Sequence, residues 1–231
     1  MRIAGYQPLT LIDYPGHVAS IIFTQGCPFR CVYCHNPELI PNEGNNALNE
    51  DAILARILKD TAMLDGVVVT GGEPTTHPDL PNFLKKIKEL GLKVKLDTNG
   101  VNPRLIERCL QLNVVDFFAM DIKHRWEKYP TVIGDTPKIA VDNCKKTFEI
   151  IQDCGIDHEF RTTILSPLHN EDDILSIAGY LRSGESYALQ QVRYEKTLAS
   201  NLDQGSQLDL NKIKDLIQGL LQQPWQGREW W

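Results

Sequence analysis

The chain alternates short apolar runs with segments of helical spacing, and this order restricts the fold more than any other feature of the sequence. Apolar and β-branched residues dominate the runs, which favours strands. We expect strands over residues 18–24, 66–70, 92–96, 114–120, 157–164 and 187–192. Helices are expected over residues 50–64, 79–90, from about 103 onward, 140–154, 171–182 and 210–221. This strand–helix order predicts a parallel sheet covered by helices.

The repeated units follow one another without a long linker or a break in composition, which indicates a single domain over residues 1–231. We place its core at about residues 14–195, followed by a C-terminal helix and an aromatic tail over residues 208–231. A complete eight-unit barrel needs about 250 residues. Six units therefore predict an α/β fold, an incomplete (β/α)6 TIM-like barrel with parallel strands that is open on one side. A doubly wound sheet is the competing topology, and in both folds ligands bind at the carboxyl ends of the strands.

Charge and hydropathy exclude several classes of partner. The chain has 30 acidic and 24 basic residues, and no basic stripe stands out, which argues against nucleic-acid binding. The longest apolar runs, residues 18–23 and 114–120, are too short to span a membrane. Gln7 and Asp13 interrupt the region where an export signal needs an apolar stretch. We therefore expect a cytoplasmic protein whose thiols are reduced.

Three of the six cysteines, Cys27, Cys31 and Cys34, lie within eight residues in a C-x3-C-x2-C pattern after the first expected strand. Three thiolates this close can surround one soft metal centre. A structural zinc site with His35 as fourth ligand is an alternative, although a residue next to Cys34 is poorly placed to reach the same ion. Chance clustering of three buried thiols is the other.

The remaining cysteines, Cys109, Cys144 and Cys154, lie in expected helices or at a helix end, without the spacing of a metal site. Free cysteines are commonly buried, so we interpret these as core thiols. A four-iron cluster normally takes four cysteines. Three ligands would leave one iron open, and an open position distinguishes catalytic from structural metal sites.

The cysteine pattern, with the aromatic Tyr33 before its last cysteine, resembles the radical S-adenosylmethionine (SAM) superfamily. Gly71-Gly72-Glu73-Pro74, after the second expected strand, is similar to the GGEP element of that superfamily. The resemblance implies a radical SAM core with a [4Fe-4S] cluster on the three cysteines, and SAM as the ligand of the open iron. It also implies that the residues of this turn, Gly71, Gly72, Glu73 and Pro74, bind the amino end of SAM. Two glycines let the backbone approach a ligand, and a carboxylate can accept from an ammonium group.

Further segments resemble the glycyl-radical-enzyme activases within the superfamily. The chain carries Cys34-His35-Asn36 directly in the cysteine loop, and matching segments at residues 11–16, 96–100 and 120–123. It looks most like the activators of anaerobic ribonucleoside-triphosphate reductase, and next most like the pyruvate formate-lyase activating enzyme. The resemblance implies a glycyl-radical enzyme as protein substrate, and reduced flavodoxin or ferredoxin as electron donor.

The resemblance also implies roles for single residues in SAM binding. Tyr33 is expected at the adenine or the cluster, Asp121 and Lys123 beside the methionine part, and Arg161 near its carboxylate. The alternatives are core packing for Tyr33, a solvated side chain for Lys123 and a salt bridge to a neighbouring helix for Arg161. No residue is assigned as an acid or base, because the cluster and SAM carry the chemistry.

A monovalent cation beside SAM is also implied, at Asp97, Thr98 and Asp121, with the carbonyl of Ala119 as a further candidate ligand. Hard cations need several oxygen ligands. The alternative for Asp97 is that it caps the turn that follows it.

Two features depart from the family pattern or lie beyond it. After the last expected strand the chain has Arg193-Tyr194-Glu195, where the formate-lyase activase has a histidine that touches the ribose. The contacts of the adenosyl end are therefore left unassigned. The tail over residues 224–231 holds three of the four tryptophans, and we expect it to cover the open edge of the barrel.

These observations favour an activase that cleaves SAM and removes hydrogen from a glycine of a partner enzyme, most similar to the activator of anaerobic ribonucleotide reductase. A radical enzyme acting on a small molecule, like the 7-carboxy-7-deazaguanine synthases, is the second interpretation. A non-catalytic iron–sulfur or zinc protein is the third, and it would have four protein ligands and no response to SAM.

Overall fold

A computed structural model describes all residues except 45–46, 167, 200–201, 203–207 and 222–231. Its strands form one sheet in the order in which they occur along the chain. They are β1 (Ile3–Thr10), β2 (Ala19–Thr24), β3 (Gly66–Gly71), β4 (Lys93–Thr98), β5 (Phe117–Asp121), β6 (Asp157–Ile164) and β7 (Ser186–Gln191). Strands β2 to β7 are parallel. The sheet is not closed, since β1 and β7 are its two edges. The expected incomplete barrel is confirmed.

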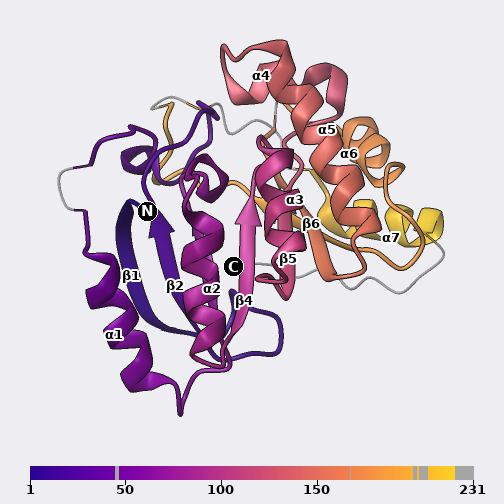
Figure 1. Ribbon diagram of the computed structural model, residues 1–231. Coiled ribbons are helices and arrows are strands. Elements are labelled where there is room, and N and C mark those ends of the chain that lie inside the picture. Colours follow the sequence, from indigo (N-terminus) through magenta and orange to yellow (C-terminus); the bar gives the residue numbers. More distant parts are fainter. Residues whose placement is uncertain (45–46, 167, 200–201, 203–207, 222–231) are drawn as a thin grey trace.

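Helices follow the strands along the curve of the sheet (Figure 1). They are α1 (Glu50–Asp60), α2 (Leu80–Glu89), α3 (Pro103–Gln111), α4 (Tyr129–Ile133), α5 (Lys138–Asp153), α6 (Glu171–Ala178) and α7 (Leu210–Leu221). Three short 3-10 helices lie at Pro37–Leu39, Pro74–Thr76 and Trp126–Lys128. Among the described helices, none is long and apolar enough to cross a membrane.

Helix α2 shows why these segments fold as they do. Phe83, Leu84 and Ile87 lie on one side of it and are buried, as expected for an amphipathic helix against a sheet. Pro81 stands in its first turn, where a missing N–H costs nothing. Gly91 follows the helix with a φ of 80°, the left-handed conformation that commonly ends helices.

The buried apolar residues form two groups. The larger one fills the space between the sheet and the helices, and includes Val67 and Val69 of β3. Val68 points to the other face of the same strand, where it packs with Tyr14, Ala19 and Ile21. Successive strand residues alternate between the faces, so β3 contributes to both groups. The smaller group fills the interior of the barrel toward the amino ends of β2 and β3.

Strand β1 was missed in the sequence. It pairs antiparallel with β2, from Ile3 opposite Thr24 to Thr10 opposite Ala19, with two register shifts between them. The expectation of an all-parallel sheet beginning after residue 14 was therefore wrong for this strand. Gly5 and Pro8 interrupt the apolar pattern, and proline is tolerated here because β1 is an edge strand.

Other boundaries differ less. Helix α4 was not expected, and β5 begins at Phe117 and not at residue 114. Helix α7 lies where the C-terminal helix was expected, whereas the aromatic tail at residues 224–231 lies outside the described residues.

Candidate functional site

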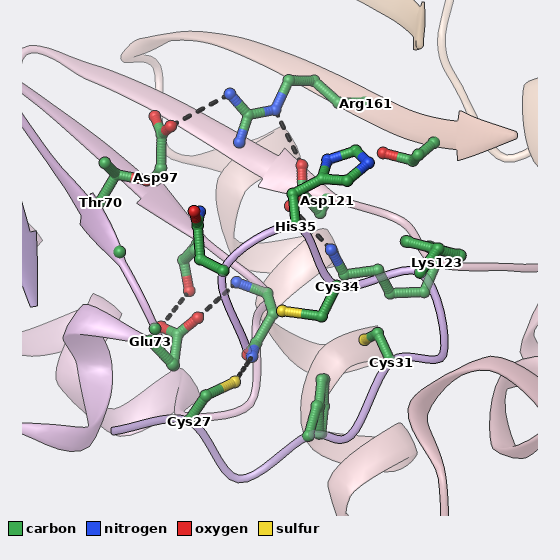
Figure 2. Close-up of a pocket in the computed structure, with 18 of the residues that line it drawn as sticks. Cys27, Cys31, Cys34, His35, Thr70, Glu73, Asp97, Asp121, Lys123 and Arg161 are labelled. Atoms are coloured by element: carbon green, nitrogen blue, oxygen red, sulfur yellow. Dashed lines mark hydrogen bonds and ion pairs between the residues drawn. The ribbon is translucent and has the colours of Figure 1, made fainter. Parts of the chain in front are cut away.

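A pocket lies at the carboxyl ends of the strands, where both candidate topologies place a ligand (Figure 2). Of the residues expected to bind the cluster, SAM or the cation, all except Ala119 line it: Cys27, Cys31, Tyr33, Cys34, Gly71, Gly72, Glu73, Pro74, Asp97, Thr98, Asp121, Lys123 and Arg161. The cavity has a volume of about 210 Å³. A single water needs only about 10–15 Å³ by the same measure, so the cavity has room for a larger ligand.

The cysteine loop forms one wall of the pocket, and its backbone is held from two sides. Gly26 N donates to Leu39 O at 2.7 Å, and Cys27 N donates to Ile40 O at 3.1 Å. Farther along, Arg30 N donates to Ile133 O at 2.8 Å, at the end of α4. Helix α4 therefore positions the thiols, although it carries no residue that lines the pocket.

The thiols are suited to bind a metal centre. Burial raises the pKa of Cys27 to about 12 and that of Cys31 to about 11, so both are protonated at neutral pH until a metal displaces the proton. Within the described part of the chain, no three His, Cys, Asp or Glu side chains are grouped to hold a single metal ion. A four-iron cluster binds each thiolate to a different iron, so it needs no such group.

A zinc site is disfavoured by the position of His35. Its Nε2 accepts a hydrogen bond of 3.1 Å from the backbone N–H of Arg193, which lies beyond β7. This bond occupies one of the two ring nitrogens that could complete a zinc site with the three thiols. The donor set thus fits a cluster with one open iron better than a closed tetrahedral zinc site.

The turn from Gly71 to Pro74 packs directly against the start of the cysteine loop. Gly72 N donates to Thr24 O at 2.9 Å, and Glu73 N donates to Gly26 O at 2.8 Å. Gly71 has a φ of 120°, and a Cβ on it would lie 2.2 Å from Thr24 N. A Cβ on Gly72 would lie 2.3 Å from Gly26 O. Both positions therefore require glycine, because any side chain would separate the turn from the loop.

The carboxylate of Glu73 is buried and connects this turn to the end of β4. It accepts hydrogen bonds from Thr75 N at 3.1 Å, Thr98 Oγ1 at 2.8 Å and Asn99 N at 2.7 Å, and a fourth from Thr75 Oγ1. Burial raises its pKa, and these hydrogen bonds oppose that rise. Three of these hydrogen bonds end on Oε1 and one on Oε2, so Oε2 keeps an acceptor position. The contact of Glu73 with SAM stays a prediction.

The opposite wall of the pocket carries a network of charges. The Arg161 guanidinium reaches Asp121 Oδ1 through Nε at 2.8 Å and Asp97 Oδ2 through a terminal nitrogen at 3.1 Å (Figure 2). Lys123 Nζ contacts Asp121 Oδ2 at 2.8 Å, and Lys95 Nζ contacts Asp97 Oδ1 at 2.5 Å. Burial alone would raise the pKa of both carboxyls, but these cations outweigh it and lower both values.

Several alternatives raised by the sequence are resolved by this network. Arg161 pairs with carboxylates of β4 and β5 and not with a helix, and Lys123 is largely buried and paired. Asp97 does not cap the following turn, because Gly100 N donates to Thr98 Oγ1 at 3.0 Å.

Lys95 and Glu159 were missed, although only 1% and 3% of their surfaces are exposed. Each stands two residues before an expected site residue, Asp97 on β4 and Arg161 on β6. Residues two apart on a strand share a face, so this spacing could have placed both side chains inside the barrel.

The segment after β7, residues 193–199, crosses from the last strand to the cysteine loop (Figure 1). Besides the contact of Arg193 with His35, Lys196 Nζ lies 2.7 Å from Glu38 Oε1. Ala199 N donates to Val32 O at 3.0 Å. The segment after β7 thus contacts the loop that follows β2.

Comparisons with known proteins agree with this geometry. The Radical SAM superfamily model matches residues 21–181. A putative glycyl-radical enzyme activating enzyme of Methanocaldococcus jannaschii is 33% identical over 199 residues, covering 82% of this chain and 79% of the relative. The pyruvate formate-lyase-activating enzyme of Clostridium pasteurianum is 28% identical over 221 residues, covering 93% of this chain and 90% of the relative.

Solved structures show the same fold at low sequence identity. SuiB of Streptococcus suis bound to its precursor peptide SuiA superposes with a TM-score of 0.70 at 15% identity, covering 91% of this chain and 48% of that one. QueE from Escherichia coli superposes with a TM-score of 0.60 at 16% identity, covering 99% of this chain and 93% of that one. Fold, cysteine loop and matched residues lead to one conclusion: the chain belongs to the Radical SAM superfamily and is a radical SAM enzyme.

Proposed function

We propose that the protein is an activase that uses a [4Fe-4S] cluster to cleave SAM and removes a hydrogen atom from a glycine of a partner glycyl-radical enzyme. Two relatives that match most of the chain carry activating-enzyme names, which supports this role. By its sequence resemblance, the partner is anaerobic ribonucleotide reductase, and the electron donor is reduced flavodoxin or ferredoxin.

The observation that carries the proposal is the single pocket shared by three thiols and a paired set of charges. Cys27, Cys31 and Cys34 would hold three irons. When bound, the reduced cluster supplies the electron that cleaves SAM into methionine and a 5′-deoxyadenosyl radical. The chain contributes positioning and exclusion of water, so no side chain has to act as an acid or base.

The charged wall suits the amino-acid end of SAM, which carries an ammonium and a carboxylate group. Lys123 and Arg161 are the cations that can face the carboxylate, and Asp121 can face a positive group. The turn of Gly71 to Pro74 presents backbone groups beside the cysteine loop, and Tyr33 lies buried next to the thiols. We propose these residues as the SAM site.

A macromolecular substrate agrees with the open sheet. Within the described residues β1 and β7 do not pair, so the barrel wall is incomplete between them. A glycine loop of a partner protein needs such a lateral entrance, whereas a small metabolite does not.

The proposal is tested with anaerobically reconstituted protein, reductant, SAM and a candidate glycyl-radical enzyme. We expect about four irons per chain, release of 5′-deoxyadenosine, and a carbon-radical signal on the partner in electron spin resonance. Deuterium placed on the partner's glycine should appear in 5′-deoxyadenosine. One tightly bound zinc without sulfide would refute the iron–sulfur centre, and deuterium transfer only from a small metabolite would move the assignment to a small-molecule enzyme.

A further inference from the structure

The two aspartates of the charged wall have no carboxylate oxygen left without a cation. Arg161 contacts one oxygen of Asp97 and one of Asp121 (Figure 2), and Lys95 and Lys123 contact the remaining two. The side chains of Lys95, Asp97 and Arg161 are 1%, 13% and 12% exposed. The pairs of Asp97 with Lys95 and Arg161 are therefore largely shielded from water, and ion pairs are stronger in such surroundings than in solvent.

The charges of this group also balance. Glu159 adds a third carboxylate, 3.8 Å from Lys95 Nζ and 3.9 Å from the terminal nitrogen of Arg161. Three carboxylates, Asp97, Asp121 and Glu159, thus face three cations. Within this directly paired group, a sodium or potassium ion would add a fourth positive charge to three carboxylates, beside cations that repel it.

The oxygens implied for a monovalent cation are already engaged. The hydroxyl of Thr98 donates to Glu73 at 2.8 Å and accepts from Gly100 N at 3.0 Å. A hard cation binds through several oxygens that are free to coordinate it. Every carboxylate oxygen of Asp97 and Asp121 already has a cationic nitrogen within 3.1 Å, so a sodium or potassium ion could bind them only beside these cations.

We infer that the Arg161 guanidinium takes the place of the monovalent cation between Asp97 and Asp121, so the pocket needs neither sodium nor potassium. Guanidinium is permanently charged and planar, and its separate nitrogens reach both carboxylates at once. Arg161 is in this sense a positioning residue, because it fixes the two aspartates. Only the SAM-binding arm of the following test rests on the proposed function.

The first arm needs no cofactor. The thermal midpoint of the purified chain is measured in sodium, potassium and choline chloride at equal ionic strength. We expect the three values to agree within about 1 °C. In Arg161→Gln the two carboxylates lose their shared cation, so we expect a lower midpoint that sodium or potassium raises relative to choline. Lys88→Gln, which removes a cation paired with Asp116 outside the pocket, should show no such dependence.

The second arm measures SAM binding to the reconstituted protein by equilibrium dialysis in the same salts. Wild-type affinity should be independent of the cation. Arg161→Gln should bind about tenfold to hundredfold more weakly in choline, the range for a lost charged hydrogen bond, with partial recovery in sodium or potassium. Arg161→Lys, which keeps the charge but cannot bridge both carboxylates, should fall between them.

Selective stabilisation of the wild type by sodium or potassium, or broadening of the ²³Na resonance by wild-type protein, would overturn the inference. Both measurements use the unchanged chain, so they decide the question even if Arg161→Gln fails to fold. Absence of SAM binding in every salt would instead refute the proposed function and leave the thermal result valid.

Discussion

The two walls of the pocket are built on opposite principles. On the cysteine wall, backbone hydrogen bonds to Leu39, Ile40 and Ile133 hold the loop, and burial raises the pKa of Cys27 and Cys31. On the charged wall, side chains of β4, β5 and β6 pair with one another until every aspartate oxygen has a partner. The first wall becomes chemically complete only with an added metal centre. The second is complete within the chain, and its charges are fixed before any ligand binds.

The largest effect is expected from breaking the cysteine wall. Cys31→Ala removes one of three ligands, so iron and sulfide content after anaerobic reconstitution should fall from about four per chain to near zero. Cys154→Ala is the matched control, because Cys154 lies at the end of α5 and does not line the pocket. Equal losses in both variants would contradict the assignment of the cluster to this loop.

The next effect tests the residue that connects the two walls. Glu73→Ala leaves buried donors of Thr75, Thr98 and Asn99 without their acceptor. Each unsatisfied donor costs about 1–3 kcal/mol, and we expect a total loss of about 3 kcal/mol in the free energy of unfolding. Urea denaturation followed by circular dichroism measures it.

Glu73→Gln serves as the comparison for that experiment. It keeps one acceptor oxygen for the threonines but turns an amide toward the N–H of Asn99, so the loss should be smaller than in the alanine variant. If Glu73→Ala is as stable as wild type, the carboxylate does not hold the turn against β4.

A third experiment examines the charged wall through pH. The folded pKa values of Asp97 and Asp121 lie below the ordinary value of 3.8, because neighbouring cations overcome the effect of burial. Their contribution to stability is therefore present above pH 3.8 and is lost as the pH falls below it. Asp121→Asn should be less stable at neutral pH, and its stability should decline less steeply in acid. The free energy of unfolding is measured by urea denaturation between about pH 3 and 6. Asp142→Asn, at an exposed position of α5, is the control, and its free energy of unfolding should fall with pH as steeply as in the wild type.

The smallest effect is expected from the ion pair between Lys196, after β7, and Glu38, after the cysteine loop. Lys196 and Glu38 are close, but their side chains are 60% and 55% exposed. Exposed pairs contribute about 0–1 kcal/mol, so Lys196→Glu should change the thermal midpoint little and leave the iron content unchanged. A large loss of iron would show that this pair, and not the backbone contacts of residues 193–199, holds the loop.

The sequence predicted the site better than it predicted the sheet. Cysteine spacing and the polar residues at the ends of β3, β4 and β5 predicted much of the pocket lining, because parallel strands bring their carboxyl ends to one rim. Phe29, Asn99 and Gln190 also line the pocket and were not predicted. Strand β1 escaped prediction since Gly5 and Pro8 break its pattern, and its pairing depends on β2 and not on its own composition.

The partners of Glu73 and Arg161 escaped prediction for a different reason. The contacts of Glu73 with Thr98 and of Arg161 with Asp121 and Asp97 join residues that are 25 to 64 positions apart in the chain, so they depend on how the strands are arranged in the sheet. Local patterns carry no information about this arrangement. Lys95 and Glu159 are the exception, because their spacing from Asp97 and Arg161 is visible in the sequence.

The contacts of residues 193–199 with the cysteine loop lie outside the hydrogen bonds of the sheet. Neighbouring strands of the sheet are also consecutive in the chain, so the ladder of hydrogen bonds from β1 to β7 follows the sequence order. The contacts of residues 193–199 with the cysteine loop and the turn after it include the backbone N–H groups of Arg193 and Ala199 and the exposed ion pair of Lys196 with Glu38. None of these three contacts belongs to the ladder, so losing them would leave every hydrogen bond between the strands in place.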